Sequence, residues 1–187
     1  PSAQTRITGD FTQTGTGRLV TQADFSANRS GTLVVEGASD LAGDLEVAAR
    51  TLAPNRSLRV FEAEGALTGT LRAIDTPAVD YTVAQNGRTM NLSISATRFE
   101  RAFDTISPNE RRVGGHLDAL FEAGAGPYDE LLADLSALSA GEDGAGQYGR
   151  ALASLSLGGS QAAAAAQSRL AQTRLDKVMR CPAIDTA

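Results

Sequence analysis

Short apolar runs separated by turn-forming residues dominate positions 19–94, and they constrain the fold more than any other feature of the sequence. Gly, Asn, Asp or Pro stands between most of the runs. Successive runs begin about 9 to 13 residues apart, a spacing typical of many short β-strands joined by regular turns. Several runs alternate apolar with polar side chains, which indicates strands with one buried face and one exposed face. The runs are LVV at 33–35, LEV at 45–47, LRVF at 58–61, LTGTL at 67–71, YTV at 81–83 and LSI at 92–94.

Two β architectures fit this pattern. In a parallel β-helix, stacked coils of short strands bury one continuous core, whereas in a β-sandwich the same strands pair antiparallel in two sheets. Asn86-Gly87, which lies between two apolar runs, is the strongest hairpin signal in the chain. Such a hairpin suits a sandwich, and it equally suits the capped end of a β-helix, where an open last coil would expose strand edges.

Helical periodicity replaces the strand pattern after Arg98. Ser107-Pro108-Asn109-Glu110 predicts a helix start, with Ser as the N-cap, Pro at the first helical position and Glu three residues after the cap. Apolar side chains at helical spacing predict a first helix up to about Phe121. Further helices are predicted over 128–138, 148–155 and 160–180, the last of which opens with an Ala run at 162–166.

The order of elements, β first and α second, divides the chain near residue 100. We expect a β domain over residues 1–100 and an α-helical region over 101–187, an arrangement typical of α+β proteins or of two juxtaposed modules. The chain begins with Pro1-Ser2-Ala3, without an initiator Met or a signal peptide, and we expect it to be a piece of a longer protein.

Composition argues against several classes of function. The net charge of −5 comes from scattered charges, whereas a nucleic-acid-binding protein needs a basic patch. The sequence contains no run of about 18 apolar residues, so we predict no membrane-spanning helix. The single cysteine, Cys181, excludes an internal disulfide and is predicted to be incidental.

The residue types that carry most catalytic chemistry are sparse. His116 is the only histidine, so a site with two histidine ligands is excluded, and it is predicted to lie on a helix surface or core edge. The sequence also lacks the Gly-x-Ser-x-Gly motif of serine hydrolases. Acidic pairs such as Asp40 with Asp44 and Glu62 with Glu64 have the spacing of exposed strand faces. We therefore predict no catalytic, cofactor-binding or metal-binding residue.

A possible calcium loop is also rejected. Residues 142–144, Glu-Asp-Gly, lack the regular oxygen-ligand spacing of an EF-hand, and they are predicted to interrupt a helix.

The order and spacing of several motifs resemble the C-terminal passenger region of bacterial autotransporters, the proteins of type V secretion. The resemblance covers roughly residues 7–178, and the chain stops before the aromatic-rich strands of that family's barrel. The loop at 142–146 departs from the family, which usually continues directly into a helix. The motifs are ITGDFTQTGTGRL at 7–19, LVVEG at 33–37, LAGDLEV at 41–47, LRVFEAEGALTGTL at 58–71, SPNE at 107–110, LSALSAGE at 135–142, SRL at 168–170 and RL at 174–175.

This resemblance implies a fold and a role. The implied fold is mainly β and then α: the end of a right-handed parallel β-helix, called the autochaperone region, followed by a short helical segment before the barrel. The β-sandwich with helices remains the alternative. The implied location is the outer membrane or surface of a Gram-negative bacterium, where the region nucleates folding of a β-helix passenger and connects it to the barrel.

The implied partners are the passenger coils and the outer-membrane barrel, with the barrel-assembly machinery as a further candidate. No nucleic acid or small-molecule substrate is expected. Two other classes of function stay open. A surface adhesin segment would bind through its exposed strand faces, and a polysaccharide-active enzyme is the least supported reading.

Overall fold

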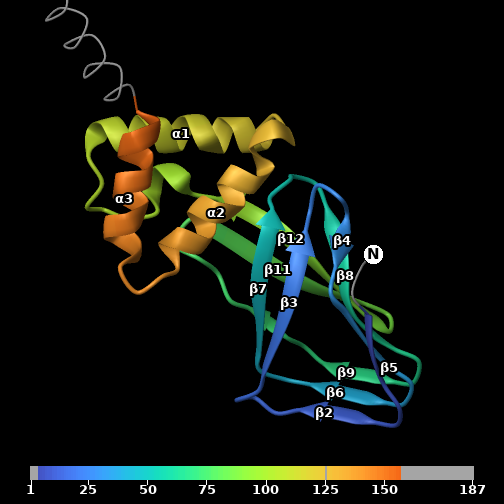
Figure 1. Ribbon diagram of the computed structural model, residues 1–187. Coiled ribbons are helices and arrows are strands. Elements are labelled where there is room, and N and C mark those ends of the chain that lie inside the picture. The colour runs from blue at the N-terminus through green and yellow to red at the C-terminus, as the bar shows by residue number, and fades with distance from the viewer. Residues whose placement is uncertain (1–3, 125, 157–187) are drawn as a thin grey trace, which may run out of the picture.

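The computed structural model describes residues 4–124 and 126–156 (Figure 1). Its first ten strands come from three successive segments of the chain, each of which contributes one strand to each of three sheets. The first segment forms β1 (Gln4–Ile7), β2 (Phe11–Gln13) and β3 (Arg18–Asp24), followed by the short β4 (Arg29–Ser30). The second forms β5 (Thr32–Val35), β6 (Ser39–Leu41) and β7 (Asp44–Thr51), and the third forms β8 (Ser57–Ala63), β9 (Leu67–Gly69) and β10 (Arg72–Ala73).

Corresponding strands of successive segments pair in parallel. Gln4 of β1 lies opposite Thr32 of β5, and Ser39 of β6 lies opposite Leu67 of β9, a separation of 28 residues in each case. Glycines occupy the same corner in all three segments: the Gly37 amide donates to the Gly9 carbonyl at 2.9 Å, and the Gly65 amide donates to the Gly37 carbonyl at 3.1 Å. The repeat therefore stacks equivalent positions directly on one another.

Antiparallel strands complete two of the sheets. β11 (Val79–Asn86) and β12 (Thr89–Thr97) form a hairpin, and β12 also pairs antiparallel with β8. The hairpin predicted at Asn86-Gly87 is confirmed, with Gly87 at φ +60° in the turn. The sheets have the orders β1-β5-β8-β12-β11, β10-β7-β3-β4 and β2-β6-β9.

The helices follow as η1 (Phe99–Arg101), α1 (Pro108–Glu122), η2 (Gly126–Tyr128), α2 (Asp129–Ser139) and α3 (Gly144–Leu155). The helix start predicted at Ser107 is confirmed. The Glu110 amide donates to the Ser107 hydroxyl, and the Ser107 amide donates to the Glu110 carboxylate at 2.6 Å, a complete capping box. The break between the helices predicted over 128–138 and 148–155 is shorter than expected, because α3 already begins at Gly144.

The helices gather at one end of the molecule, opposite the sheet formed by β2, β6 and β9 (Figure 1). They share one hydrophobic core with the strands, in which Phe25, Leu45 and Phe61 of the β region and Phe99, Leu132, Leu135, Tyr148 and Leu152 of the helical region are fully or almost fully buried. The division into residues 1–100 and 101–187 stays a prediction, although the strands do end at Thr97.

Polar contacts fix α2 against the strand turns. The Leu52 amide donates to the Asp129 carbonyl at 3.0 Å, and the Ser26 hydroxyl donates to the Asp129 carboxylate, which is 6% exposed. Farther along α2, the hydroxyls of Thr76 and Ser136 lie 2.9 Å apart. Buried polar groups of this kind need partners, so these contacts favour a single position for the helix.

The fold predicted from the sequence, mainly β with the end of a right-handed parallel β-helix and then a short helical segment, is wrong. Within residues 4–124 and 126–156, the chain forms a mixed α/β fold with three sheets, two of which combine parallel and antiparallel strands, and with three α-helices packed into the same core. An alternating pattern indicates a half-buried strand, but it does not indicate which strand pairs with it or in which direction. The alternative, a β-sandwich with helices, is not confirmed either.

Candidate strand-addition site

The first segment presents unpaired strand edges at the end of the stack. β1 and β2 are the outermost strands of their sheets, and each pairs in parallel on one side only within the part of the chain that the structure describes. β3 pairs with β7 along its length, whereas on its other side β4 covers only Ala23 and Asp24. Exposed strand edges carry backbone donors and acceptors that can pair with another strand.

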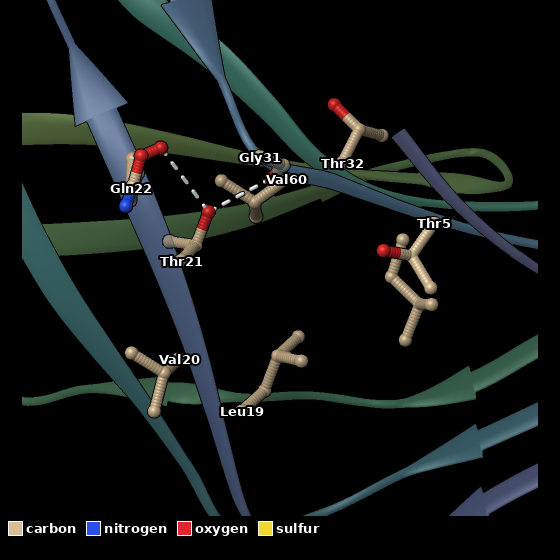
Figure 2. Close-up of a pocket in the computed structure, with 9 residues that line it drawn as sticks. Thr5, Leu19, Val20, Thr21, Gln22, Gly31, Thr32 and Val60 are labelled. Atoms are coloured by element: carbon tan, nitrogen blue, oxygen red, sulfur yellow. Dashed lines mark hydrogen bonds between the residues drawn. The ribbon is translucent and has the colours of Figure 1, made fainter. Parts of the chain in front are cut away.

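A cavity of about 220 Å³ opens between β3 on one side and β1, β5 and β8 on the other (Figure 2). Its wall is mixed, with aliphatic side chains from three strands and several hydroxyl groups. The lining residues are Thr5, Leu19, Val20, Thr21, Gln22, Gly31, Thr32, Leu33 and Val60.

One side of this cavity is held in place by hydrogen bonds. The Thr21 hydroxyl donates to the Gly31 carbonyl at 2.8 Å and approaches the Gln22 carbonyl at 3.3 Å (Figure 2). The Gly31 amide also donates to the Gln22 carbonyl at 2.9 Å. These bonds tie the chain before β5 to β3, so the cavity wall is preformed.

The apolar residues of the cavity are less covered than those deeper in the stack. Leu19 and Leu33 are half-buried, while Leu45, which lies opposite Leu19 on β7, is fully buried. Val20 is 59% exposed, the most exposed of the large apolar side chains in the described residues. Covering this apolar surface would be favourable, at about 25 cal/mol for each Å² removed from water.

Ion pairs connect successive segments along the outer faces. Nη1 of Arg6 lies 3.1 Å from the Glu36 carboxylate and 3.0 Å from that of Glu64, so one guanidinium bridges two acids from the next two segments. The hydrogen bonds to these two carboxylates raise the pKa of Arg6 above its ordinary value, and the bond to Glu36 has the larger effect. Arg18 pairs with Glu46 in the same manner, at 2.9 Å. These exposed pairs contribute little energy each, but they favour the observed register.

At the opposite end of the stack, the hairpin covers the edge of β8. β12 lies against β8, and the Arg88 guanidinium of the hairpin donates to the Glu64 carbonyl at 2.5 Å. The Ala63 amide donates to the Arg88 carbonyl at 2.9 Å. The two ends of the stack therefore differ in the five-stranded sheet: the hairpin covers β8 at one end, whereas β1 has an unpaired edge beside the cavity at the other.

The acidic pairs considered as catalytic candidates are engaged in structural contacts. Asp44 pairs with Arg72 at 2.7 Å, Glu62 with Arg59 at 3.0 Å, and Glu64 with Arg6, while Asp40 accepts a hydrogen bond from Thr68 at 2.8 Å. Each carboxylate serves the packing between strands or along one strand, and none of these pairs converges on a common cavity.

The other residues considered for catalysis or metal binding do not come together in one site either. His116 lies on the exposed face of α1, as predicted for a helix-surface histidine. Asp143, the residue just before α3, forms an ion pair at 3.1 Å with Arg150 inside that helix. In the described ranges, His, Cys, Asp and Glu side chains form no group of three or more that could hold a metal ion. Cys181 and the predicted helix over 160–180 lie outside the described residues.

Among the helices that the structure describes, none has the length and apolar character needed to cross a membrane. No protein-family model matches this chain, and neither the curated proteins nor the solved structures contain a match.

The sequence analysis did not identify the open end as a site. A usable signal was present, because Gly9, Gly37 and Gly65 recur at equal intervals of 28 residues. Such an internal period would have shown that residues 4–24 form the first of three equivalent segments, with no described segment to cover it.

Proposed function

We propose that this chain is a non-catalytic structural module that nucleates folding of a secreted passenger and connects it to an outer-membrane translocator barrel. This is the role implied by the resemblance to the C-terminal passenger region of bacterial autotransporters. In this proposal the passenger strands add to the edges of β1, β2 and β3, and the helical region lies toward the barrel.

The observation that carries the proposal is the difference between the two ends of the stack. At one end β1 and β2 have an unpaired edge, β3 is paired on its outer side only at Ala23 and Asp24, and a partly apolar cavity lies beside β1 and β3. At the other end the β11–β12 hairpin covers β8. Among the described strands β9, β10 and β11 also have an unpaired outer edge, so the partly apolar cavity beside β1 and β3 is what distinguishes the end proposed to accept strands.

The physical reason for such a role lies in the cost of starting a stacked structure. A first segment must order its residues before neighbouring segments cover its apolar face, and repeated structures consequently propagate from any stable unit. A preformed edge supplies both hydrogen-bonding groups and apolar surface to the next strand. Folding of each added segment then requires only local ordering against an existing template.

The test uses a longer protein that carries a passenger before residue 4 of this chain. Leu19→Asp places a charge in the cavity, at a side chain that is half-buried here and becomes covered when a further strand is added. We expect protease resistance and surface display of the passenger to be lost, because an unpaired charge would be buried at the new contact. Thr82→Asp, at an exposed position of β11, is the matched control and should leave display unchanged.

A second measurement separates templating from simple instability. The unfolding transition of the isolated chain should persist in the Leu19→Asp variant. Deletion of residues 41–71, which removes parts of the second and third segments, should abolish passenger folding altogether. Normal display and protease resistance after this deletion would refute the proposal.

A further inference from the structure

A second cavity, on the rim of the five-stranded sheet, differs sharply from the one at the open end. It has a volume of about 560 Å³ and is lined mainly by polar side chains. Its lining comes from β1, the turn before β4, β8 and the two strands of the hairpin. Because β1, β5, β8 and β12 are neighbours in one sheet, the groove extends about 14 Å across the strands.

Four hydroxyl groups line this groove, together with an equal number of carboxamides. Gln4, Asn28, Asn86 and Asn91 each contribute one. The amides of Asn28, Asn86 and Asn91 make no side-chain hydrogen bond to another described residue, and a carboxamide offers two donor hydrogens and an acceptor oxygen. Asn28 adopts a left-handed conformation, φ 54°, in the turn between β3 and β4, which sets it on the rim.

The hydroxyl groups in the groove wall have a different role. Ser30 and Thr32 both donate to the Arg59 carbonyl, at 2.6 and 2.8 Å, and the Thr89 hydroxyl donates to the Asn86 carbonyl at 2.9 Å. These bonds hold β4, β5 and the hairpin in position. Internal hydrogen bonds thus hold the wall in place, and the carboxamides, together with the exposed Ser57 hydroxyl, are the groups left to contact a ligand.

The charge of the groove is balanced. Arg59 is its one ionised lining residue, and its guanidinium lies 3.0 Å from the Glu62 carboxylate. An anionic ligand would need further cationic groups, a metal cation would need carboxylates, and an apolar ligand would need apolar walls. The lining therefore favours a neutral ligand that both donates and accepts hydrogen bonds along its length.

From these features we infer that the groove binds a neutral oligosaccharide, whose hydroxyl groups pair with the carboxamides of Asn28, Asn86 and Asn91. The length of the groove fits several linked sugar rings rather than a single ring. The groove adjoins the cavity of the proposed strand-addition site, since Thr32 lines both, but the three asparagines lie on the turn after β3 and on the hairpin, outside that cavity.

The test is a titration of the full chain with cellohexaose, maltohexaose and laminarihexaose, followed through the side-chain amide resonances of Asn28, Asn86 and Asn91. We expect these signals to shift with at least one of the three sugars. Asn91→Ala and Asn86→Ala should each weaken binding about fivefold to tenfold, the effect of one lost hydrogen bond. Asn109→Ala, which removes an exposed carboxamide from α1, is the control and should bind with unchanged affinity.

Several outcomes would overturn the inference. One is the absence of any shift at about 10 mM sugar, a concentration that populates even weak complexes. Others are an equal loss of affinity in Asn109→Ala, shifts confined to residues outside the groove, and binding of only a polygalacturonate hexamer, which would assign the site to an acidic ligand. Failure of the sugar to bind would leave passenger display, and hence the strand-addition proposal, unaffected.

Discussion

The Tyr148 hydroxyl donates a hydrogen bond to the Phe99 carbonyl, with 2.6 Å between the two oxygens. Both side chains are fully buried, and the Tyr148 ring also packs against Phe103 at a centroid distance of 5.6 Å. The bond joins α3 to η1, which directly follows the last strand. It is therefore one of the contacts through which the helical region is attached to the β region.

Replacement of Tyr148 by Phe should destabilise the protein by about 1 to 2 kcal/mol, because the ring packing is kept while the buried Phe99 carbonyl loses its donor. The free energy of unfolding, measured in urea, checks this expectation. Tyr128→Phe is the control, since Tyr128 is 45% exposed and its hydroxyl is accessible to water. Equal changes in the two variants would contradict the role assigned to the bond.

Burial of tyrosine side chains makes the protein sensitive to alkaline pH. Burial raises the pKa of Tyr81 from 10.0 to about 12, and burial also raises the pKa of Tyr148. Because the folded state holds the proton more tightly than the unfolded state, this stabilisation is complete below the unfolded pKa and is lost as pH rises from about 10 to about 12.

For Tyr81 this pKa difference corresponds to about 3 kcal/mol. We expect Tyr81→Phe to lose less stability than the parent chain between about pH 9 and pH 12, as measured by denaturant unfolding across that range. Tyr128→Phe serves again as the exposed control. A parallel loss of stability in the parent chain and in Tyr81→Phe would rule out this origin of the pH dependence.

The glycine corner allows no side chain at Gly65. A Cβ atom there would lie 2.7 Å from the carbonyl carbon and oxygen of Gly37, both of which belong to the backbone. We expect Gly65→Ala to destabilise the protein by about 1 to 3 kcal/mol, because two stacked segments must move apart. Thermal unfolding measures the change, and Gly15→Ala, where a Cβ atom would meet nothing within 4 Å, should be nearly neutral.

Charges at the centre of the β region should prevent folding. Leu45 is fully buried and Val60 is 1% exposed. We expect Leu45→Asp and Val60→Asp to lose several kcal/mol each, since an unpaired carboxylate would be buried. Circular dichroism and urea unfolding report the loss. Ala48→Asp, on an exposed position of the same strand β7, should stay folded; if all three variants fold alike, the inward face is misassigned.

Local sequence chemistry predicted the elements whose formation depends on neighbouring residues. The Asn86-Gly87 turn could be predicted because Gly adopts a positive φ without strain. The start of α1 could be predicted because Ser107 and Glu110 satisfy each other's backbone amides. The burial of Leu45 and Val60 followed from the alternation of apolar and polar residues along their strands.

Strand pairing and the candidate sites depended on contacts between distant residues. The pairing of Leu33 with Phe61, and the antiparallel return of β12 onto β8, follow from which surfaces cover one another, and a local pattern does not record this. The groove lined by Asn28 and Asn91 exists only because the sheet brings them together.

The sequence by itself thus determined the type and limits of many elements, the residues that face inward and the sparsity of catalytic groups. Only the tertiary structure decided that the sheets are mixed, that the helices share the strands' core, and that one end of the stack is left open. The physical reason is the distance along the chain over which each kind of interaction acts. Backbone conformation and capping are set within a few residues, whereas pairing direction and cavities depend on the packing of segments about 28 residues or more apart.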